Sequence, residues 1–272
     1  MAIKSPLINV MERAARKAGR GLLRDFGEVE QLQVTTKGPA DFVSNADHKA
    51  EKTIHDELKR VRPDFGFLME ESGEIPGSSD LYRWVVDPLD GTTNFLHGIP
   101  HFCISIGVEG RSVIGGKAMS EIVAGIVYDP VHDHSYWAEK GAGAYLNDRR
   151  LRVSGRRDLA TSLLASGLPT LGRADPDVHQ AQTRALMEKV AGIRRFGSSA
   201  LDLAWVAAGR FDAFWEVALS PWDIAAGILL VREAGGFVTE IDGGNNMMAS
   251  GSLLASNGQI HAEVRHILAN PA

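Results

Sequence analysis

The chain has 272 residues, which is enough for one large domain or for two closely packed parts with a substantial core. Hydrophobic residues make up 44% of it, and the net charge of −5 gives no reason to expect general affinity for polyanions. A single cysteine, Cys103, excludes an internal disulfide and fits a reducing compartment, and no apolar run approaches the length of a membrane span. We therefore expect a cytoplasmic protein without a membrane segment and without a nucleic-acid partner.

The first predicted elements are two helices separated by a loop. A helix is predicted over 6–26, because apolar residues recur there at helical spacing after a Ser-Pro start. The stretch 37–47 contains a Gly-Pro pair and is expected to be a loop, and a polar helix follows over 48–60. Asn45 or Asp47 can cap that helix. Capping is the interpretation of Asp47 that the residues alone give, and the family resemblance described below implies a second one, a role beside a metal site.

A pair of glutamates follows the next apolar stretch. Residues 65–69 are predicted to form a strand, and Glu70-Glu71 comes directly after it. Acidic pairs usually lie on a solvated surface, but α/β proteins place ligands at the ends of strands. Glu70 is therefore a candidate site residue, and the Gly-, Pro- and Ser-containing stretch 73–81 is predicted to be a surface loop.

The central stretch of the chain places two carboxylates at the end of another strand. Residues 84–86 are Trp-Val-Val, an apolar, β-prone run that predicts a buried strand. Asp87 and Asp90 follow, and the Pro88 between them favours a sharp turn, which exposes the carbonyl group of Leu89. Two neighbouring carboxylates repel each other unless a cation neutralises them, and hard oxygen ligands of this kind suit Mg²⁺.

A candidate phosphate cradle adjoins these acids. Residues 91–94 read Gly-Thr-Thr-Asn, in which the glycine permits close approach of the backbone and a helix start presents N–H groups to an anion. Asp-Pro and Asp-Gly are also ordinary turn dipeptides, so most isolated strings of this type are turns. The apolar strand before this one and the long pattern around it favour the functional interpretation.

Several strands are predicted after this motif, and they are expected to form an antiparallel meander rather than βαβ units. Their expected ranges are 102–109, 113–118, 122–128 and 135–139. We place a change of subdomain within 141–157, which divides the chain into an N-terminal α+β part (1–145) and a C-terminal α/β part (146–272) that pack closely as one functional unit.

The second half is more helical, and it contributes two further acids. Glu216 ends a predicted strand over 211–216, and Asp223 begins a helix with few polar faces that should be deeply buried. An aspartate at a helix start is also favourable through the helix dipole alone. The other expected elements are helices over 175–190, 197–208 and 259–268 and strands over 193–196, 237–239 and 253–255.

Two blocks of sequence resemble the signature of the inositol monophosphatase family, a group of Mg²⁺-dependent phosphomonoesterases. The first block is WVVDPLDGTTNF over 84–95, and the second is PWDIAAG over 221–227, followed by EAGG over 233–236. Their order and separation also match, and the similarity extends over nearly the whole chain. The resemblance implies a mixed α/β (α+β) fold, a layered α-β-α-β-α sandwich of the sugar-phosphatase type with two sheets.

The resemblance also implies a site that binds two or three Mg²⁺ ions. One metal would be bound by Glu70, Asp87 and the carbonyl of Leu89, and another by Asp87, Asp90 and Asp223. Two departures from the family pattern stand nearby: Leu89 replaces a common isoleucine, and His97-Gly98 stands where a basic residue is frequent.

Catalytic and substrate-binding roles are implied in the same way. Glu70 and Thr92, with Asp47 nearby, would position and activate the attacking water. The phosphate would be held by the N–H groups of Gly91 and Thr92, and the hydroxyls of a polyol would contact Glu216, Asp223, Ser199 and Asp90. Family members are typically lithium-sensitive homodimers, so both properties are expected here.

The leading interpretation is a phosphatase that hydrolyses inositol 1-phosphate, a small phosphorylated polyol. The same site also suits fructose 1,6-bisphosphate, histidinol phosphate or 3′-phosphoadenosine 5′-phosphate. A further alternative is a regulatory protein on this scaffold that binds RNA or the transcription machinery.

Overall fold

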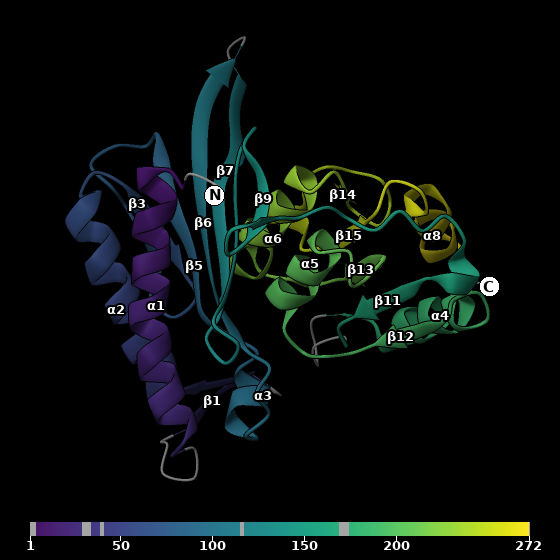
Figure 1. Ribbon diagram of the computed structural model, residues 1–272, viewed down its shortest axis with the longest axis horizontal. Coiled ribbons are helices and arrows are strands. Elements are labelled where there is room, and N and C mark those ends of the chain that lie inside the picture. The colour runs from purple at the N-terminus through teal and green to yellow at the C-terminus, as the bar shows by residue number, and fades with distance from the viewer. Residues whose placement is uncertain (1–3, 29–33, 39–40, 115–116, 169–173, 272) are drawn as a thin grey trace.

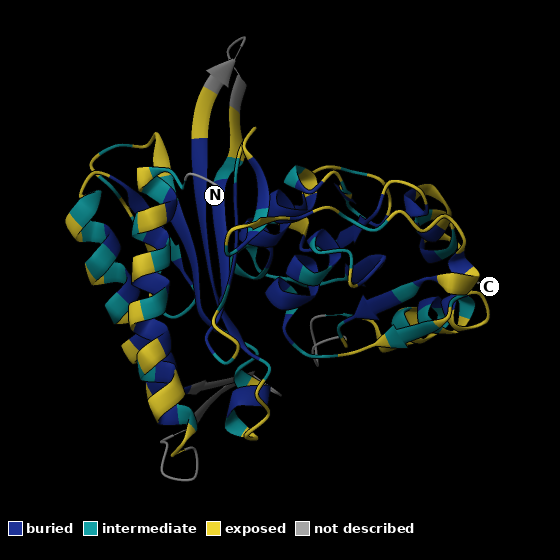
Figure 2. Cartoon of the chain, in the orientation of Figure 1, coloured by how far each residue is buried: buried dark blue, intermediate teal, exposed yellow. Residues whose placement is uncertain are grey.

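The computed structural model describes residues 4–28, 34–38, 41–114, 117–168 and 174–271. Its elements form five layers in the order α-β-α-β-α, as the family resemblance implies (Figure 1). A pair of long helices covers one face of a large sheet, a second pair lies between that sheet and a smaller one, and a third pair covers the far side of the smaller sheet. Residues between these layers are largely buried (Figure 2). Apolar residues form the core clusters there.

The large sheet has eight strands in the order β10-β9-β8-β7-β6-β5-β3-β4. All neighbours are antiparallel except β3 and β5, which run parallel, so the meander expected from the sequence is present. The strands are β3 (Gly66–Met69), β4 (Gly73–Ile75), β5 (Tyr82–Asp90), β6 (Cys103–Ile114), β7 (Lys117–Asp129), β8 (His134–Glu139), β9 (Gly143–Leu146) and β10 (Arg149–Arg150).

Two helices cover the outer face of this sheet: α1 (Pro6–Phe26) and α2 (Asn45–Val61). Ser5 caps α1 by accepting a hydrogen bond from a backbone N–H of the first turn, as its sequence predicts. The cap of α2 is Ser44, so the prediction that Asn45 or Asp47 caps this helix is wrong; Asp47 instead completes a capping box with Ser44.

The expected loop before α2 also contains regular structure. A small antiparallel hairpin forms from β1 (Val34–Gly38) and β2 (Asp41–Ser44). Of the Gly-Pro pair that suggested a loop, Gly38 ends β1 and pairs with Asp41 of β2, whereas Pro39 lies outside the described residues. Similarly, a separate strand over 113–118 was expected, whereas Val113 and Ile114 end β6, Lys117 and Ala118 begin β7, and residues 115–116 lie outside the described ranges.

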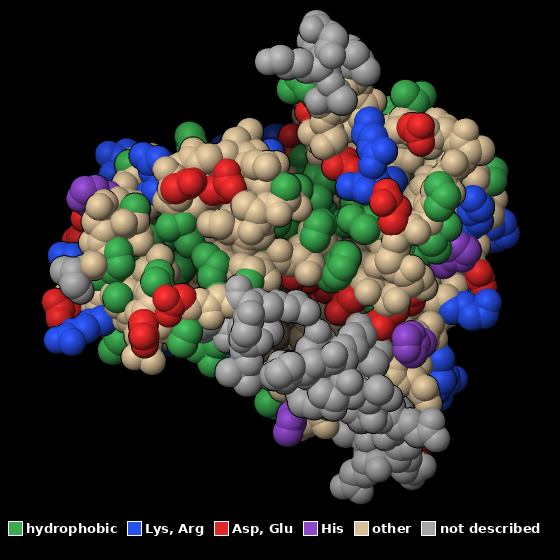
Figure 3. Space-filling model, turned by 180° about the vertical axis from the view of Figure 1, so that it is seen from behind, with side chains coloured by type: hydrophobic (Ala, Val, Ile, Leu, Met, Phe, Trp, Pro, Cys, Tyr) green, Lys and Arg blue, Asp and Glu red, His purple; other side chains and the backbone are tan. Residues whose placement is uncertain are grey.

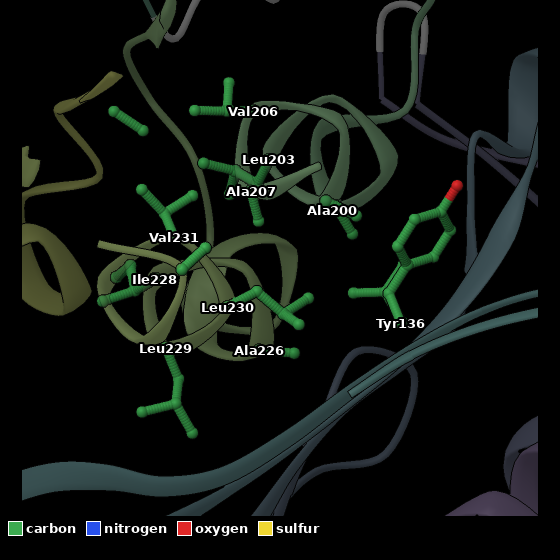
Figure 4. Packing of buried hydrophobic residues seen from close by; sticks show 14 of the residues in the cluster. Tyr136, Ala200, Leu203, Val206, Ala207, Ala226, Ile228, Leu229, Leu230 and Val231 are labelled. Atoms are coloured by element: carbon green, nitrogen blue, oxygen red, sulfur yellow. The ribbon is translucent and has the colours of Figure 1, made fainter. Parts of the chain in front are cut away.

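The middle layer consists of α5 (Ser199–Ala207) and α6 (Pro221–Glu233), which pack tightly through small residues. Their apolar contacts surround Leu203 and Leu230 (Figure 4). A Cβ atom at Gly125 would lie 2.9 Å from the Cα atom of Ala226, and one at Gly227 would lie 2.4 Å from a methyl carbon of Leu203. Glycine is therefore required at both positions, because it allows α6 to lie directly on the large sheet and on α5.

The smaller sheet has the order β12-β11-β13-β15-β14, in which β11 is parallel to β12 and β13 and the remaining pairs are antiparallel. Its strands are β11 (Leu163–Ser166), β12 (Gly192–Arg194), β13 (Ala213–Glu216), β14 (Phe237–Thr239) and β15 (Leu253–Ser256). The outer helices are α4 (Pro176–Met187) and α8 (His261–Ala269), and two short helices, α3 (Thr92–Leu96) and α7 (Met247–Ser250), lie in connections.

Four strands of the two sheets, β4, β9, β10 and β11, have no counterpart in the sequence-based expectations, and β4 begins the stretch 73–81 that was predicted to be a surface loop. β10 is only two residues long, and the sequence of β11 begins within a stretch that gives no clear alternation. No helix in the described ranges has the length and apolar character needed to cross a bilayer.

Candidate active site

Glu70 and Asp87 meet because two parallel strands end side by side. In the pairing of β3 with β5, Met69 lies opposite Val86, so the next residue of each strand is Glu70 and Asp87 respectively. The backbone N–H of Glu70 donates a hydrogen bond of 3.2 Å to the carbonyl of Val86, which extends the ladder by one step. Strand register therefore brings together two acids that are far apart in the sequence.

The segment from Asp87 to Asp90 bends but still belongs to strand β5 of the large sheet. Strand β5 continues to Asp90, but its register against β6 shifts between these two aspartates, as at a β-bulge. Oδ1 of Asp87 accepts a hydrogen bond of 2.9 Å from the N–H of Leu89, which fixes the bend. Gly91 follows with φ of 91° and caps α3, and a Cβ atom there would lie 3.0 Å from the carbonyl oxygen of His101. Both observations explain the glycine.

Asp90 is held by groups from the start of α5. Its Oδ2 accepts hydrogen bonds from the hydroxyl of Ser198 at 2.6 Å and from the N–H of Ala200 at 2.8 Å. The thiol of Cys103 lies 3.6 Å from the same oxygen and is buried, as its apolar surroundings in the sequence suggest. Burial raises the pKa of Asp90, and these hydrogen bonds oppose the rise.

Asp223 enters the site from the first turn of α6. Ser220 caps this helix, and the N–H of Ser220 donates a hydrogen bond of 2.7 Å to Oδ2 of Asp223 in a capping box. The hydroxyl of Ser105 donates to the carbonyl of Trp222 at 3.2 Å, which ties this helix start to β6. The position of Asp223 thus follows from the close packing of α6 on the large sheet.

The four acids share one electrostatic environment. Burial raises the pKa of Asp87 well above its usual range, and neighbouring negative charges raise it further. Those charges belong to Glu70, Asp90 and Asp223, and Asp87 also shares a hydrogen bond with Glu70. Acidic side chains gather near the middle of the face shown in Figure 3. The structure therefore brings all four predicted acids together.

The donor set of this cluster fits a hard divalent cation. It consists only of carboxylate oxygens and the nearby carbonyl of Leu89, which are the ligands that Mg²⁺ prefers. Burying several carboxylates side by side is costly unless a cation offsets their charge. Across the described ranges, no three His, Cys, Asp or Glu side chains stand close enough in this conformation to hold one metal ion as they are.

Asp47 and Thr92 lie next to this cluster. The hydroxyl of Thr92 is 2.9 Å from the carbonyl oxygen of Leu89 and 3.3 Å from Oδ1 of Asp47. A hydroxyl has one proton and donates it to one acceptor at a time, so its lone pairs can accept a proton from another group. Asp47 therefore both stabilises the start of α2 and contacts the motif, and its two interpretations are compatible.

Glu216 and Ser199 form a second polar pair at the end of β13. The hydroxyl of Ser199 donates a hydrogen bond of 2.9 Å to Oε2 of Glu216. Burial and the charge of Asp90 raise the pKa of Glu216 to about 7, although the Ser199 hydrogen bond and the charge of Arg195 oppose the rise. A buried carboxyl group whose pKa is strongly raised is a candidate functional group, and its ionised form accepts charge-assisted hydrogen bonds.

Sequence reasoning missed several residues that hold the site together. Ser198 was expected only as part of a helix start, yet its hydroxyl contacts Asp90. The amide of Asn94 donates to the carbonyls of His101 at 2.8 Å and Phe196 at 2.7 Å and so links the two halves of the chain. The buried carboxyl group of Asp202 also lies near Glu216 and was not singled out. Asn94 belongs to the predicted Gly-Thr-Thr-Asn stretch, but its link to Phe196 was not expected. For Ser198 and Asp202, the polar residue type was the only available signal.

Comparison with known proteins gives a consistent result. The model of the inositol monophosphatase family matches residues 3–270. The chain is 55% identical over 254 residues to the inositol-1-monophosphatase of Mesorhizobium japonicum, covering 93% of this chain and 92% of the relative. It is 43% identical over 265 residues to the Nus factor SuhB of Escherichia coli, covering 97% and 95%. The crystal structure of extragenic suppressor protein suhB from Bartonella henselae superposes with a TM-score of 0.92 at 53% identity, covering 98% of this chain and 100% of that one.

Proposed function

The chain belongs to the inositol monophosphatase family and is a phosphatase, and we propose that it hydrolyses inositol 1-phosphate to inositol and phosphate with bound Mg²⁺. The observation that carries this proposal is the convergence of Asp87 with Glu70, Asp90 and Asp223. The name of the Mesorhizobium japonicum relative supports the choice of substrate.

The acids would hold the cofactor. The family is generally metal-dependent, and Glu70, Asp87, Asp90, Asp223 and the carbonyl of Leu89 supply oxygen ligands for two or three Mg²⁺ ions. When bound, the ions lower the pKa of a water molecule and stabilise the departing oxygen. The sharing of Asp87 between ions, as the family resemblance implies, is part of this proposal.

The remaining residues of the motif act on water and phosphate. The hydroxyl of Thr92 is nearer to the carbonyl of Leu89 than to Asp47, but with that carbonyl serving as a metal ligand the hydroxyl would direct its proton to Asp47. Thr92 would then have a lone pair that can accept a proton from the attacking water, and Glu70 would help to orient this water. The N–H groups of Gly91 and Thr92 stand at the start of α3 and bind a phosphate oxygen. The oxygen of the attacking water forms a new bond to phosphorus while the bond between phosphorus and the inositol oxygen breaks. The inositol oxygen takes up a proton, so that inositol leaves as the free alcohol.

The leaving alcohol would lie toward Glu216. The ionised carboxylate accepts hydrogen bonds from vicinal hydroxyls of the polyol, and Ser199 holds its other oxygen in place. The carboxylates of Asp90 and Asp223 would supply two more acceptors for hydroxyls of the polyol. A homodimeric state, lithium sensitivity, a cytoplasmic location and the division into parts 1–145 and 146–272 are further expectations of this proposal.

One variant and one substrate panel test the proposal. Asp90→Asn should abolish Mg²⁺-dependent phosphate release while circular dichroism and the melting temperature show a folded protein; near-normal turnover would contradict the metal assignment. Phosphate release should be measured with inositol 1-phosphate, fructose 1,6-bisphosphate, histidinol phosphate and 3′-phosphoadenosine 5′-phosphate. A higher kcat/KM for any of the last three would replace inositol 1-phosphate as the proposed substrate.

A second candidate function comes from the relatives named Nus factor SuhB, at 42–43% identity. It is a regulatory role through RNA or the transcription machinery, on the same scaffold. A pull-down with inactive Asp90→Asn as bait distinguishes the two functions, because a partner retained without activity would support the regulatory role.

A further inference from the structure

Helix α2 carries two buried carboxylates one turn apart on the face that looks toward the site. Asp47 and Glu51 are separated by four residues, which places them on the same side of a helix. Ile54 and Leu58 continue this stripe as apolar core residues. The N-terminal half of the buried face of α2 is therefore polar although it packs in the interior, and this requires partners for both acids.

Each of these acids contacts a different segment of the candidate metal site. Oδ1 of Asp47 lies 3.3 Å from the hydroxyl of Thr92, in the motif after β5. Oε2 of Glu51 accepts a hydrogen bond of 2.8 Å from the N–H of Glu71, and its Oε1 accepts one from the hydroxyl of Ser72. One helix thus reaches two of the three segments that supply the predicted ligands, and the third is the start of α6 with Asp223.

The contacts of Glu51 fix the turn that begins at Glu70. On the strand side, the N–H of Glu70 is bonded to the carbonyl of Val86. On the other side, both oxygens of Glu51 are used by the two residues that follow Glu70. Glu51 is only 4% exposed, whereas Ser72 is exposed, so both hydrogen bonds are partly buried. The backbone of Glu70 is consequently held from both directions.

We propose that Glu51 is a positioning residue for Glu70: it orients this ligand by clamping the following turn onto helix α2. The inference rests on the proposed metal-binding function of Glu70. Without Glu51, the N–H of Glu71 loses its acceptor in the interior and the turn relaxes, so Glu70 is no longer presented at a fixed distance from Asp87. Residues that orient a metal ligand without touching the metal commonly change metal affinity by about 10- to 100-fold.

Three variants and a matched control separate positioning from general stability. Glu51→Ala removes both acceptors. Glu51→Gln keeps both contacts but makes one of them with a donor. Its carbonyl oxygen can accept a hydrogen bond from the N–H of Glu71, and its amide group can donate one to the hydroxyl of Ser72. Ser72→Ala removes one donor and no buried charge, so it serves if Glu51→Ala does not fold. Glu57→Ala is the control, since Glu57 lies on the same helix and its ion pairs among the described residues are with the surface cations Arg13, Lys17 and Arg60.

The measurements are the dissociation constant for Mg²⁺ by isothermal titration calorimetry and the melting temperature without metal. We expect Glu51→Ala to weaken Mg²⁺ binding by about 10- to 100-fold, Ser72→Ala by a smaller factor, and Glu51→Gln to restore most of the affinity. Glu57→Ala should lower the melting temperature without weakening Mg²⁺ binding. Wild-type affinity in both Glu51→Ala and Ser72→Ala would overturn the positioning role.

These outcomes differ from a failure of the proposed function itself. If the full-length wild-type protein showed no Mg²⁺ binding, the proposed cofactor would be wrong. If it bound Mg²⁺ but released no phosphate from inositol 1-phosphate, the proposed substrate would be wrong, and the titrations would still report on Glu51.

Discussion

The hydroxyl of Ser198 donates a hydrogen bond of 2.6 Å to Oδ2 of Asp90, and this contact joins the start of α5 to the end of β5. The two residues lie on opposite sides of the predicted boundary near residue 145. Asp223 reaches the same site from α6, so the acids are contributed by both parts of the chain. A site assembled in this way requires the two parts to pack rigidly, and the small residues between α6 and the large sheet provide that packing.

We predict that Ser198→Ala weakens Mg²⁺ binding. A hydrogen bond to a charged group contributes about 1.5–3 kcal/mol, so its loss should lower the affinity about tenfold or more. The same hydrogen bond lowers the pKa of Asp90, so its loss also favours the protonated form that cannot bind the ion. The measurement is a calorimetric Mg²⁺ titration at constant pH.

Ser199→Ala is the matched variant for this experiment. Its hydroxyl bonds to Glu216 rather than to the side chain of Asp90. We predict that this variant has a higher KM for inositol 1-phosphate and an unchanged dissociation constant for Mg²⁺. Equal effects of the two substitutions on metal binding would contradict the separate roles assigned to the two serines.

The acids of the large sheet were predictable because they follow recognisable strands. Apolar runs before Glu70 and Asp87 identified β3 and β5, and strand ends are where such folds bind ligands. The parallel pairing that places these two residues side by side was not predictable, since a single sequence does not give the order of strands in a sheet. The family resemblance, rather than the pattern itself, supplied that contact.

Contacts that depend on tertiary packing could not be predicted. Ser198 has the sequence context of an ordinary helix start, and only the fold shows that it faces Asp90. The strand β11 escaped notice because its sequence carries no clear alternation, although it lies in the middle of the smaller sheet. The cap of α2 was predicted at Asn45 or Asp47, which lie one and three residues after the actual cap, Ser44, and errors of this kind are usual at element boundaries.

We predict that substrate affinity depends on the ionisation of Glu216. Its pKa is raised to about 7, so the carboxylate is ionised above that pH and becomes protonated as the pH falls. KM for inositol 1-phosphate should therefore rise as the pH is lowered through 7. A cation that offsets the charge of Asp90 moves this change to lower pH, because that charge contributes to the raised pKa.

The assignment to Glu216 is checked with Glu216→Gln and with a second substrate. The amide does not titrate, so the variant should have a high KM that no longer changes in this pH range. p-Nitrophenyl phosphate has no polyol hydroxyls, and its KM should be nearly the same in the wild type and in Glu216→Gln. A pH dependence that persists in the variant would assign the ionisation to another group.

Gly167→Ala is predicted to displace Glu216 by steric contact. An ideal Cβ atom at Gly167 would lie 1.9 Å from Oε1 of Glu216, so the carboxylate would have to leave its present place. We expect KM for inositol 1-phosphate to rise about tenfold while the dissociation constant for Mg²⁺ stays unchanged. Gly155→Ala is the control, since nothing lies within 4 Å of a Cβ atom there. An unchanged KM in Gly167→Ala would show that Glu216 does not bind the substrate in this position.

Asp202→Asn is predicted to stabilise the folded protein. Asp202 is 1% exposed, and among the described residues its Oδ1 has no hydrogen-bond partner. Burial and the charge of Glu216 raise its pKa well above the usual range. An acid whose pKa is raised on folding destabilises the folded state once the pH exceeds its ordinary value of about 3.9, and the effect grows as the pH rises toward the raised pKa.

Removal of this ionisable group should therefore raise the melting temperature by a few degrees at pH 8 and by little at pH 4. Asp212→Asn is the matched control, because Asp212 is equally buried but accepts hydrogen bonds from Ser154, from Arg156 and from the N–H of Leu163. Its substitution should lower the melting temperature. Differential scanning calorimetry without metal measures both changes, and a lower melting temperature for Asp202→Asn at pH 8 would show that its carboxylate has a stabilising partner in solution.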